Sequence, residues 1–302
     1  MKTLKQDLYQ EVTDKIVACL EQGVPPWVCP WNNTSYTHLP LNFATQNNYQ
    51  GINIVLLWLS QLLGAYPRSS WLTFKQAALL GGKVRKHEQG TRLVFYKPME
   101  KKTGEYDSEG NEVVKRFPLI RAFTVFNVGQ IEGLPLAAEP AQTNAASQPE
   151  TIADAFASSV LQAAGVAIVH DGARAYYRPM TDTITLPDKH RFKTQYDYYA
   201  TATHELIHAT GHAKRCDRKP YACGQAKVSY AYEELVAEMG ASFCMAWLGI
   251  SGEVVDHASY IDGWLQVLKA DKKAIFKAAA EAQKAHEWLI SKVNAGQQGL
   301  AA

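Results

Sequence analysis

Apolar side chains recur at helical spacing in several stretches of the chain. Residues 1–23 have the periodicity of an amphipathic helix, and the almost continuously apolar run 52–63 predicts a buried helix. Beyond Gly249 the spacing is helical again over 254–268 and 272–291, where the apolar positions are expected to complete a core. Helices are therefore predicted in both halves of the chain.

Shorter segments have the character of β-strands. Residues 93–97 and 117–128 are rich in β-branched and aromatic side chains, and the polar segment 101–111 between them predicts a long hairpin connection. The pattern further predicts a helix at 152–164, short strands at 166–169 and within 176–186, and a turn at 179–182. This arrangement predicts an α+β fold.

A segment poor in large apolar side chains divides the chain. Residues 136–150 are rich in Pro, Ala and polar residues, which predicts a linker between a domain at 1–135 and a domain at 151–302. The composition, 47% hydrophobic and 20% charged over 302 residues, is that of a globular chain long enough for two domains. The longest apolar run is too short to span a bilayer and no signal-peptide core is present, so no membrane partner is expected. The odd number of scattered cysteines, five, favours a cytoplasmic protein over a disulfide framework.

The strongest chemical signal is an HExxH motif. His204 and His208 are four residues apart, so on a helix both lie on one face and can coordinate one Zn²⁺ ion. Glu205, beside the first histidine, is then placed to act as the catalytic base on a metal-bound water. The motif predicts a catalytic type of zinc site that still needs a third protein ligand.

A second helical stretch supplies that ligand. Glu234 and Glu238 share a helix face, and we expect Glu234 to bind the metal. Glu238 would accept a hydrogen bond from the far nitrogen of a ligand histidine and so fix its tautomer. The adjacent residue Glu233 is an alternative third ligand, because the motif can be aligned with either of the two consecutive glutamates.

The motifs around the metal resemble those of the gluzincin metallopeptidases, in which a helix with a ligand glutamate follows the HExxH helix. The metzincin pattern is excluded because its third histidine would fall at Lys214. His212 lies two turns from His204, too far along the axis to share a metal, so Gly211 is interpreted as a helix C-cap. In a zincin-like fold, residues 183–186 would be the edge strand that pairs with an extended substrate.

Positive charge gathers in the N-terminal part of the chain. Residues 1–135 carry 15 Lys and Arg against 11 Asp and Glu, whereas 136–302 carry 16 against 18. Between 71 and 97 the basic residues interleave with aromatic ones, a pattern typical of single-stranded nucleic-acid grooves. The predicted DNA contacts are Lys83, Arg85, Lys86, Arg92, Tyr96 and Lys97. Strand alternation lets one aromatic of this segment face DNA, and we expect Tyr96 to do so while Phe95 joins Leu93 in the core.

Further sequence motifs resemble those of a known family, and the resemblance covers nearly the whole chain. A Pro-Trp strip at 25–31 follows the first helix, and a final strand ends in Val125-Phe126-Asn127. Between them lie Asn42, Thr45, Tyr49, Gly51, Ile52, Asn53, Trp71, Thr73, Gln76, Ala77, Gly81 and Gly82. These residues resemble the N-terminal domain of ArdC-type antirestriction proteins, which is shared with plasmid primases of the TraC type. One departure is Gln46, which stands where the family often has glycine.

The resemblance implies an N-terminal single-stranded-DNA-binding domain joined to a C-terminal zincin-like metallopeptidase domain. It implies an antirestriction protein of a conjugative plasmid that protects incoming DNA from host restriction. The alternative is a zinc endopeptidase that cleaves DNA-associated or restriction proteins, with the N-terminal domain as a targeting module. A third hypothesis is a binding protein whose metal is purely structural, so catalysis and a protein substrate remain open at this stage.

Overall fold

The N-terminal half is built around a mixed sheet from which one hairpin projects. The computed structural model describes residues 7–27, 39–106, 108, 110–136, 165–222, 225–250 and 258–299. The sheet order is β1-β2-β5-β4, with β1 parallel to β2 and the other pairs antiparallel, and β3 pairs with β6 in a small second sheet. The elements are α1 (Leu8–Glu21), β1 (Leu41–Asn42), α2 (Ile52–Leu63), β2 (Ser70–Thr73), α3 (Phe74–Leu79), β3 (Lys83–Val84), β4 (Thr91–Tyr106), β5 (Glu112–Asn127), the 3-10 turn η1 (Val128–Gln130) and β6 (Ile131–Glu132).

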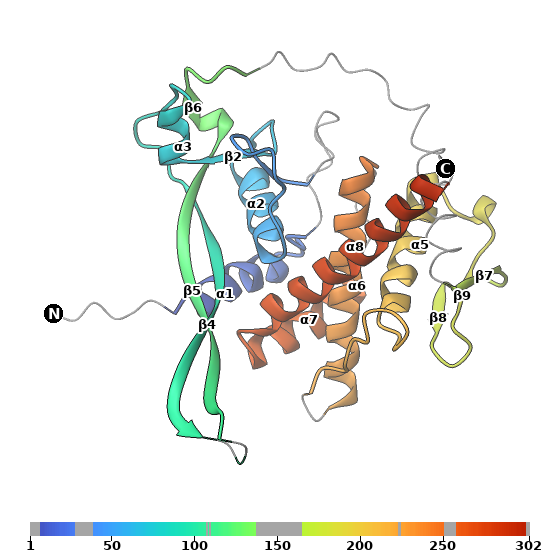
Figure 1. The fold of residues 1–302 in the computed structure, drawn as a ribbon. Coiled ribbons are helices and arrows are strands. Elements are labelled where there is room, and N and C mark those ends of the chain that lie inside the picture. The colour runs from blue at the N-terminus through green and yellow to red at the C-terminus, as the bar shows by residue number, and fades with distance from the viewer. Residues whose placement is uncertain are drawn as a thin grey trace.

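The C-terminal half is a helical bundle with a small sheet at one side (Figure 1). Its strands lie in the order β7-β9-β8. The elements are β7 (Ala167–His170), β8 (Tyr176–Arg178), β9 (Thr183–Leu186), the 3-10 turn η3 (Lys189–Arg191), α5 (Gln195–Thr210), α6 (Ala226–Leu248), α7 (Ala258–Ala270) and α8 (Ala274–Gly299). The α+β prediction is confirmed, and the described residues contain no helix long and apolar enough to cross a membrane.

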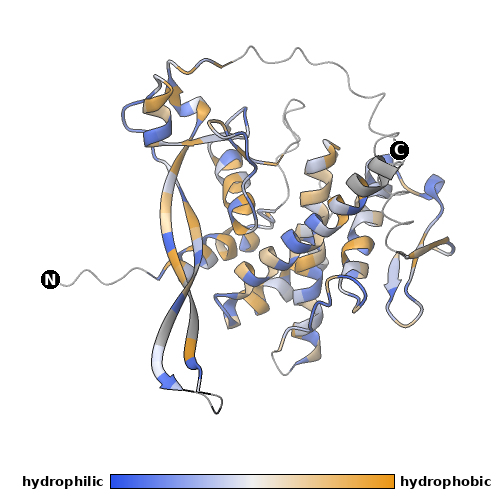
Figure 2. Cartoon of the chain, viewed as in Figure 1, coloured by the Kyte–Doolittle hydropathy of each residue, from blue (hydrophilic) through white to orange (hydrophobic). Residues whose placement is uncertain are grey.

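The helix predicted at 52–63 is confirmed with the same bounds. Seven of its residues are buried, and Figure 2 shows it as one of the most uniformly apolar elements of the fold. The amide of Asn53 bonds both backbone atoms of Val94, N and O, at 2.9 Å each. Because β4 is an edge strand, this side chain satisfies polar groups that would otherwise have no partner.

Two strand predictions are wrong. The segment 101–111 is not a loop, since β4 and β5 continue through 16 residues each and leave only a short connection at the tip. Residues 183–186 form a strand, but β9 pairs with β7 on one side and β8 on the other, so β9 is central and β8 is an edge. Local pattern gives strand character, whereas sheet order depends on long-range pairing.

The two halves share one hydrophobic core. The rings of Trp27 and Trp264 have centroids 5.0 Å apart, and those of Trp58 and Phe243 are 5.8 Å apart. Thr13 of α1 donates to the carbonyl of Lys272, in the turn between α7 and α8, at 2.8 Å. The N-terminal helices therefore pack directly on the helices of the C-terminal half. The linker expected at 136–150 and the helix at 152–164 lie outside the described residues, apart from residue 136.

Gln46 adopts a left-handed backbone with φ of 57°. This is the position where the resembling family often has glycine, and a side chain there costs roughly 1 kcal/mol. The Gln46 amide donates to the carbonyl of Phe43 at 2.7 Å, which stabilises the turn locally.

Candidate metal centre

Helix α5 carries both histidines of the HExxH motif. It begins at a capping box in which Thr194 and Asp197 bond each other's backbone N–H, and it ends at the predicted C-cap Gly211. A Cβ at Gly211 would meet the Arg218 guanidinium at 3.0 Å, so glycine leaves room there for that side chain.

Helix α6 lies close against α5 because it has a glycine at the contact. A Cβ added to Gly240 would lie 2.9 Å from Ile207 Cδ1 and Cγ2, inside van der Waals contact. This close approach presents the glutamates of α6 to the histidines of α5.

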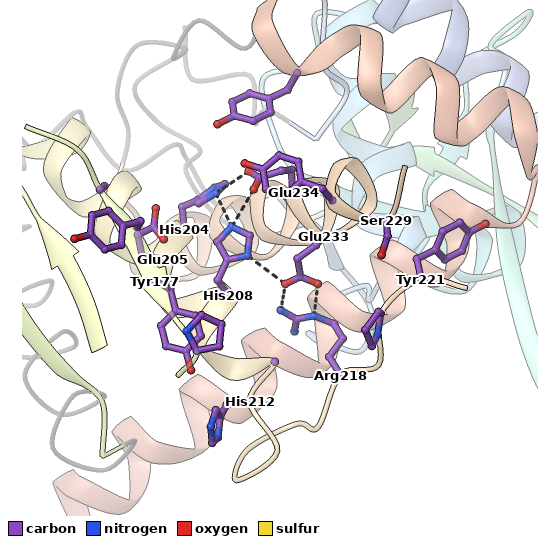
Figure 3. Close-up of a pocket in the computed structure, with 17 residues that line it drawn as sticks. Tyr177, His204, Glu205, His208, His212, Arg218, Tyr221, Ser229, Glu233 and Glu234 are labelled. Atoms are coloured by element: carbon purple, nitrogen blue, oxygen red, sulfur yellow. Dashed lines mark hydrogen bonds and ion pairs between the residues drawn. The ribbon is translucent and has the colours of Figure 1, made fainter. Parts of the chain in front are cut away.

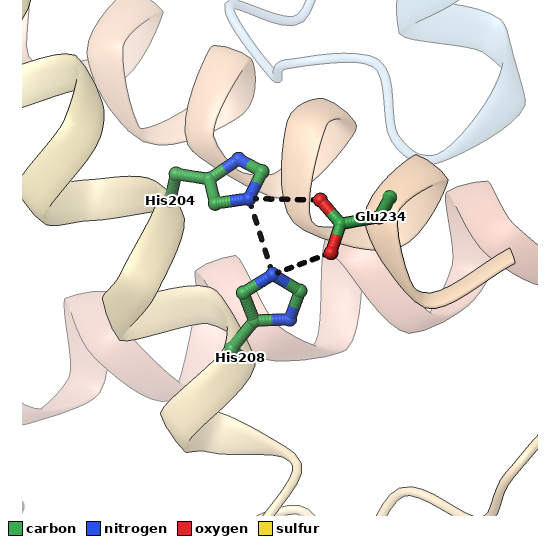
Figure 4. Close-up of side chains that lie close together, drawn as sticks. All are labelled: His204, His208 and Glu234. Carbon is green, nitrogen blue, oxygen red and sulfur yellow. Dashed lines mark hydrogen bonds and ion pairs between the residues drawn. The ribbon is translucent and has the colours of Figure 1, made fainter. Parts of the chain in front are cut away.

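Three side chains converge between the helices (Figure 4). The Nε2 atoms of His204 and His208 are 3.1 Å apart, and the Glu234 carboxylate lies 3.3 Å from the first and 3.5 Å from the second. Within the described part of the chain, these three residues are the one group of His, Cys, Asp or Glu donors close enough together to hold a metal.

The donor set fits a divalent metal. Four ligands at roughly 2.0–2.1 Å in a tetrahedron place neighbouring donors about 3.3 Å apart. The three donor separations lie close to that value, and two imidazoles with one carboxylate are borderline to hard ligands suited to zinc and its neighbours.

The outward nitrogen of each histidine also faces a carboxylate. His204 Nδ1 lies 3.4 Å from Glu238, and His208 Nδ1 lies 3.2 Å from Glu233. These contacts turn both Nε2 atoms toward the common point. Glu238 thus occupies the place expected from the sequence, whereas Glu233 lies on the far side of the His208 ring from Glu234 and faces neither Nε2 atom (Figure 3).

Arg218 holds Glu233 in that position. Its guanidinium makes two hydrogen bonds to the Glu233 carboxylate, donates to the Ile207 carbonyl at 2.9 Å, and donates to the Thr210 hydroxyl at 3.1 Å. Although burial opposes ionisation, His208 and Arg218 lower the pKa of Glu233 to about 2, so the carboxylate is ionised.

The electric field at the centre favours a cation. Burial alone would lower the pKa of His204, but the carboxylates of Glu234 and Glu238 outweigh it and raise that pKa to about 10. A site that attracts a proton this strongly through carboxylates also attracts a metal ion.

Glu205 lies beside the converging donors and is almost fully buried. Burial raises the pKa of its carboxyl, while the two histidines and a backbone hydrogen bond from Tyr177 act in the opposite direction. The Tyr177 phenol donates to Asp182 at 2.8 Å, and Arg215 bonds both partners. These contacts fasten β8 to the end of α5, where Arg215 also donates to the Ala209 carbonyl.

A cavity of about 500 Å³ opens over the donors (Figure 3). Residues 175–177 of the β8 segment form one wall, and Tyr230 and Tyr260 form another. Tyr230 precedes Glu234 by one helical turn, and burial together with the Glu234 carboxylate raises the pKa of its phenol. An edge strand beside a metal centre offers unpaired backbone groups to an extended chain, and here that strand is β8, not β9.

The predicted DNA contacts lie in two elements. Lys83 is in β3, with Arg85 and Lys86 in the turn that follows, while Arg92, Tyr96 and Lys97 lie on β4. Arg85 is paired with Glu88 at 2.6 Å and Arg92 with Glu11 at 2.8 Å. Tyr96 and Lys97 are consecutive in a strand and therefore point to opposite faces, so the six residues do not share one surface.

The expectation that Phe95 is a core residue is wrong. Leu93 is fully buried, but Phe95 is 50% exposed and Tyr96 is 60% exposed. The hairpin leaves the body of the domain between Leu93 and Phe95. The face of β4 that is buried at Leu93 is therefore exposed to solvent at Phe95, two residues later.

Sequence reasoning missed the roles of Arg218 and Tyr177. Both lie in non-helical segments, where no periodicity relates them to the histidines. A signal for Glu233 was present, because the second histidine also needs a carboxylate for its outer nitrogen, and Glu233 is adjacent to the ligand candidate.

Comparisons with known proteins cover both halves. Residues 6–126 match a family model described as the N-terminal domain of anti-restriction factor ArdC, and residues 155–281 match one described as a zincin-like metallopeptidase. Two Escherichia coli proteins called DNA primase TraC are 36% and 38% identical over 96% and 95% of this chain. The chain spans 28% and 20% of their lengths.

Other relatives match along their whole length. The uncharacterized protein y4eC of Sinorhizobium fredii is 34% identical, over 94% of this chain and 91% of that protein. The metal-free crystal structure of the antirestriction protein ArdC from plasmid R388 superposes with a TM-score of 0.78, at 40% identity over 96% of this chain and 98% of that one. Its Mn(II)-bound structure gives 0.74, at 38% identity over 95% and 98%.

Proposed function

The chain belongs to the family of ArdC antirestriction proteins, and on that premise we propose that it binds single-stranded DNA and protects incoming plasmid DNA from host restriction. In this proposal the N-terminal domain supplies the DNA surface and the C-terminal domain supplies a zinc site of the metallopeptidase type. The conjugative plasmid context is part of the proposal and is supported by the plasmid origin of the ArdC relative.

The observation that supports the metal part of the proposal is the convergence of three donor side chains between α5 and α6. The donor atoms of His204, His208 and Glu234 have the mutual separations expected of ligands to one ion, and both histidines have a carboxylate on the outer nitrogen. We propose zinc as the resident ion because a donor set of two imidazoles and one carboxylate is typical of catalytic zinc. The Mn(II)-bound structure of the ArdC relative supports the binding of a divalent ion.

A second candidate function, that of an endopeptidase, is favoured by the position of Glu205 under the edge strand β8. Zinc in this site would supply a Lewis acid that polarises a carbonyl and acidifies water. Glu205 would take the proton from that water and deliver it to the leaving amine. Strand β8 would hold an extended peptide across the cavity by backbone pairing.

For DNA, we propose contacts on the turn after β3 and on both faces of β4, which include Lys83, Arg85, Lys86, Arg92, Tyr96 and Lys97. The lysines are exposed, and the partners of Arg85 and Arg92 are surface carboxylates that a phosphate can displace. Tyr96 is an exposed ring on the face of β4 that also carries Arg92.

The test is a comparison of the parent chain with Glu205→Gln in two assays. The zinc-loaded parent should bind single-stranded DNA more tightly than duplex, with an affinity that falls as salt rises. Glu205→Gln should keep both the metal and DNA binding, because neighbouring residues on a helix point in different directions and Glu205 is not a ligand.

Protection of transferred DNA in a restricting host then separates the two candidate functions. We expect Glu205→Gln to protect as the parent does, which would leave proteolysis outside the protective mechanism. Loss of protection with DNA binding intact would favour the endopeptidase. A parent that fails to bind single-stranded DNA at low salt would contradict the DNA part of the proposal.

A further inference from the structure

The β4–β5 hairpin extends well beyond the sheet from which it starts (Figure 1). Its strands pair from Thr91 opposite Val125 to Tyr106 opposite Glu112. Leu93 near its root is fully buried, whereas Phe95, two residue pairs further out and on the same face, is half exposed. The free part of the hairpin, which we call the arm, therefore starts at Phe95.

Phe95 has a positively charged neighbour across the strands. Arg121 of β5 is directly opposite it, so the two Cβ atoms lie roughly 5 Å apart on one face. Lys97 is two residues along β4 and projects from that face about 7 Å away. Phe95, Arg121 and Lys97 are all exposed and form an aromatic surface with a cation on two sides.

The two cations are available to an anion. In the described part of the chain no ion pair engages Lys97 or Arg121, whereas Arg85 and Arg92 each have a carboxylate partner. A phosphate that approaches Lys97 or Arg121 displaces no such partner.

The base of this surface is rigid. Asn53 of α2 holds both backbone atoms of Val94, the residue before Phe95, and that contact is part-buried. A ring held next to a fixed backbone loses little further freedom on binding, which favours affinity.

We propose that Phe95, Arg121 and Lys97 form a base-stacking site for single-stranded DNA on the face of the arm opposite Tyr96. An unpaired base stacks on the exposed phenyl ring while the cations contact the flanking phosphates. Duplex DNA fits this site less well, because its bases are already stacked on each other. The inference rests on the proposed DNA-binding function and deepens it by naming the surface.

The arm provides its own control. Tyr106 is 69% exposed on the same hairpin, but it lies directly opposite the carboxylate residue Glu112. Its ring is at least as accessible as that of Phe95, yet its surroundings repel phosphate. If exposure alone determined stacking, the rings of Phe95 and Tyr106 would both contribute to DNA binding. The proposed site predicts that only Phe95 does.

The experiment measures the affinity of the full-length, zinc-loaded chain for a fluorescent oligothymidylate over a range of NaCl concentrations. Phe95→Ala and Phe95→Leu should each bind about 5- to 150-fold more weakly than the parent, with an unchanged salt slope, because they lose stacking and not charge. Phe95→Trp should bind at least as well as the parent. Arg121→Ala should reduce the slope of log affinity against log salt by about 0.7, and Tyr106→Ala should bind like the parent.

Binding by Phe95→Leu within twofold of a parent that does bind would overturn the inference and leave the proposed function standing. Equal losses in Phe95→Leu and Tyr106→Ala would also overturn it, since a general loss of exposed rings would then explain the result. Failure of the parent to bind would instead overturn the proposed function. Melting temperatures equal to the parent's establish that the variants are folded, and Phe95→Leu keeps apolar bulk in case the alanine variant does not fold.

Discussion

His286 is a buried titratable residue outside the metal centre. It is 4% exposed, lies in α8, and its Nδ1 is 3.4 Å from the sulfur of the fully buried Cys244. Burial lowers the pKa of His286 to about 4, because a charged imidazole would have no solvent and no carboxylate partner there.

The first prediction concerns the pH dependence of stability. The folded pKa of His286 lies below the unfolded value of about 6.5, so as pH falls the unfolded chain binds this proton first. Its contribution is intact above pH 6.5 and is lost progressively toward pH 4, by about 3 kcal/mol at most. Denaturation of zinc-loaded protein across this window should show a shallower decline for His286→Gln than for the parent.

His190, which is exposed in η3, supplies the control for that experiment. His190→Gln should follow the parent curve. If His286→Gln and His190→Gln have the same pH slope, the buried neutral imidazole is not the cause.

At the residue scale, the helical spacing was enough to predict the faces of the metal centre. It could not decide between Glu233 and Glu234 with certainty, because adjacent residues differ by only 100° on a helix and the outcome depends on how α6 lies against α5. The environment of Phe95 was mispredicted for a related reason. Alternation gives the face of a strand residue but not the point at which the strand leaves the core.

Among the elements, the contact of α5 with α6 sets the geometry of the donors. The second prediction is that Gly240→Ala destabilises the protein by about 1 kcal/mol. Alanine gains about 1 kcal/mol of helix propensity, but overpacking against the buried, β-branched Ile207 costs about 1–3 kcal/mol. Denaturant unfolding of the zinc-loaded variants measures the balance.

Ile207→Val removes Cδ1, one of the two atoms 2.9 Å from the added methyl group, and allows a double-mutant cycle. The double variant Gly240→Ala/Ile207→Val should be more stable than the sum of the single changes predicts. Additive effects would show that the helices do not compete for space at this contact.

Helix bounds were predictable from the sequence where the apolar pattern was strong, as for α2. Strand lengths were not, because the polar residues of 101–106 are compatible with a solvent-exposed ribbon as well as with a loop. The central place of β9 was beyond local pattern, since both of its partners are chosen by tertiary packing.

At the scale of the whole molecule, the N-terminal and C-terminal halves form one packed unit. Trp27 and Trp58 of the N-terminal half are buried against Trp264 and Phe243 of the C-terminal half. The domain division at 135 stays a prediction, and the hydrophobic core extends across it.

The third prediction follows from this shared core. The zinc-loaded full chain should unfold in a single calorimetric transition, and a fragment of residues 1–135 should lack the native cooperative unfolding because it exposes both tryptophans. Two separate transitions, with the fragment melting at the temperature of one of them, would contradict the coupling of the two halves.

We propose that one divalent ion binds between α5 and α6 on His204, His208 and Glu234. The most direct test is anomalous X-ray diffraction at the zinc absorption edge from crystals of the zinc-loaded protein. We expect one peak per chain, about 2.0–2.2 Å from both Nε2 atoms and from a Glu234 oxygen, with Glu233 still bonded to Arg218. A peak ligated by Glu233 in place of Glu234, or no peak at these histidines, would contradict it.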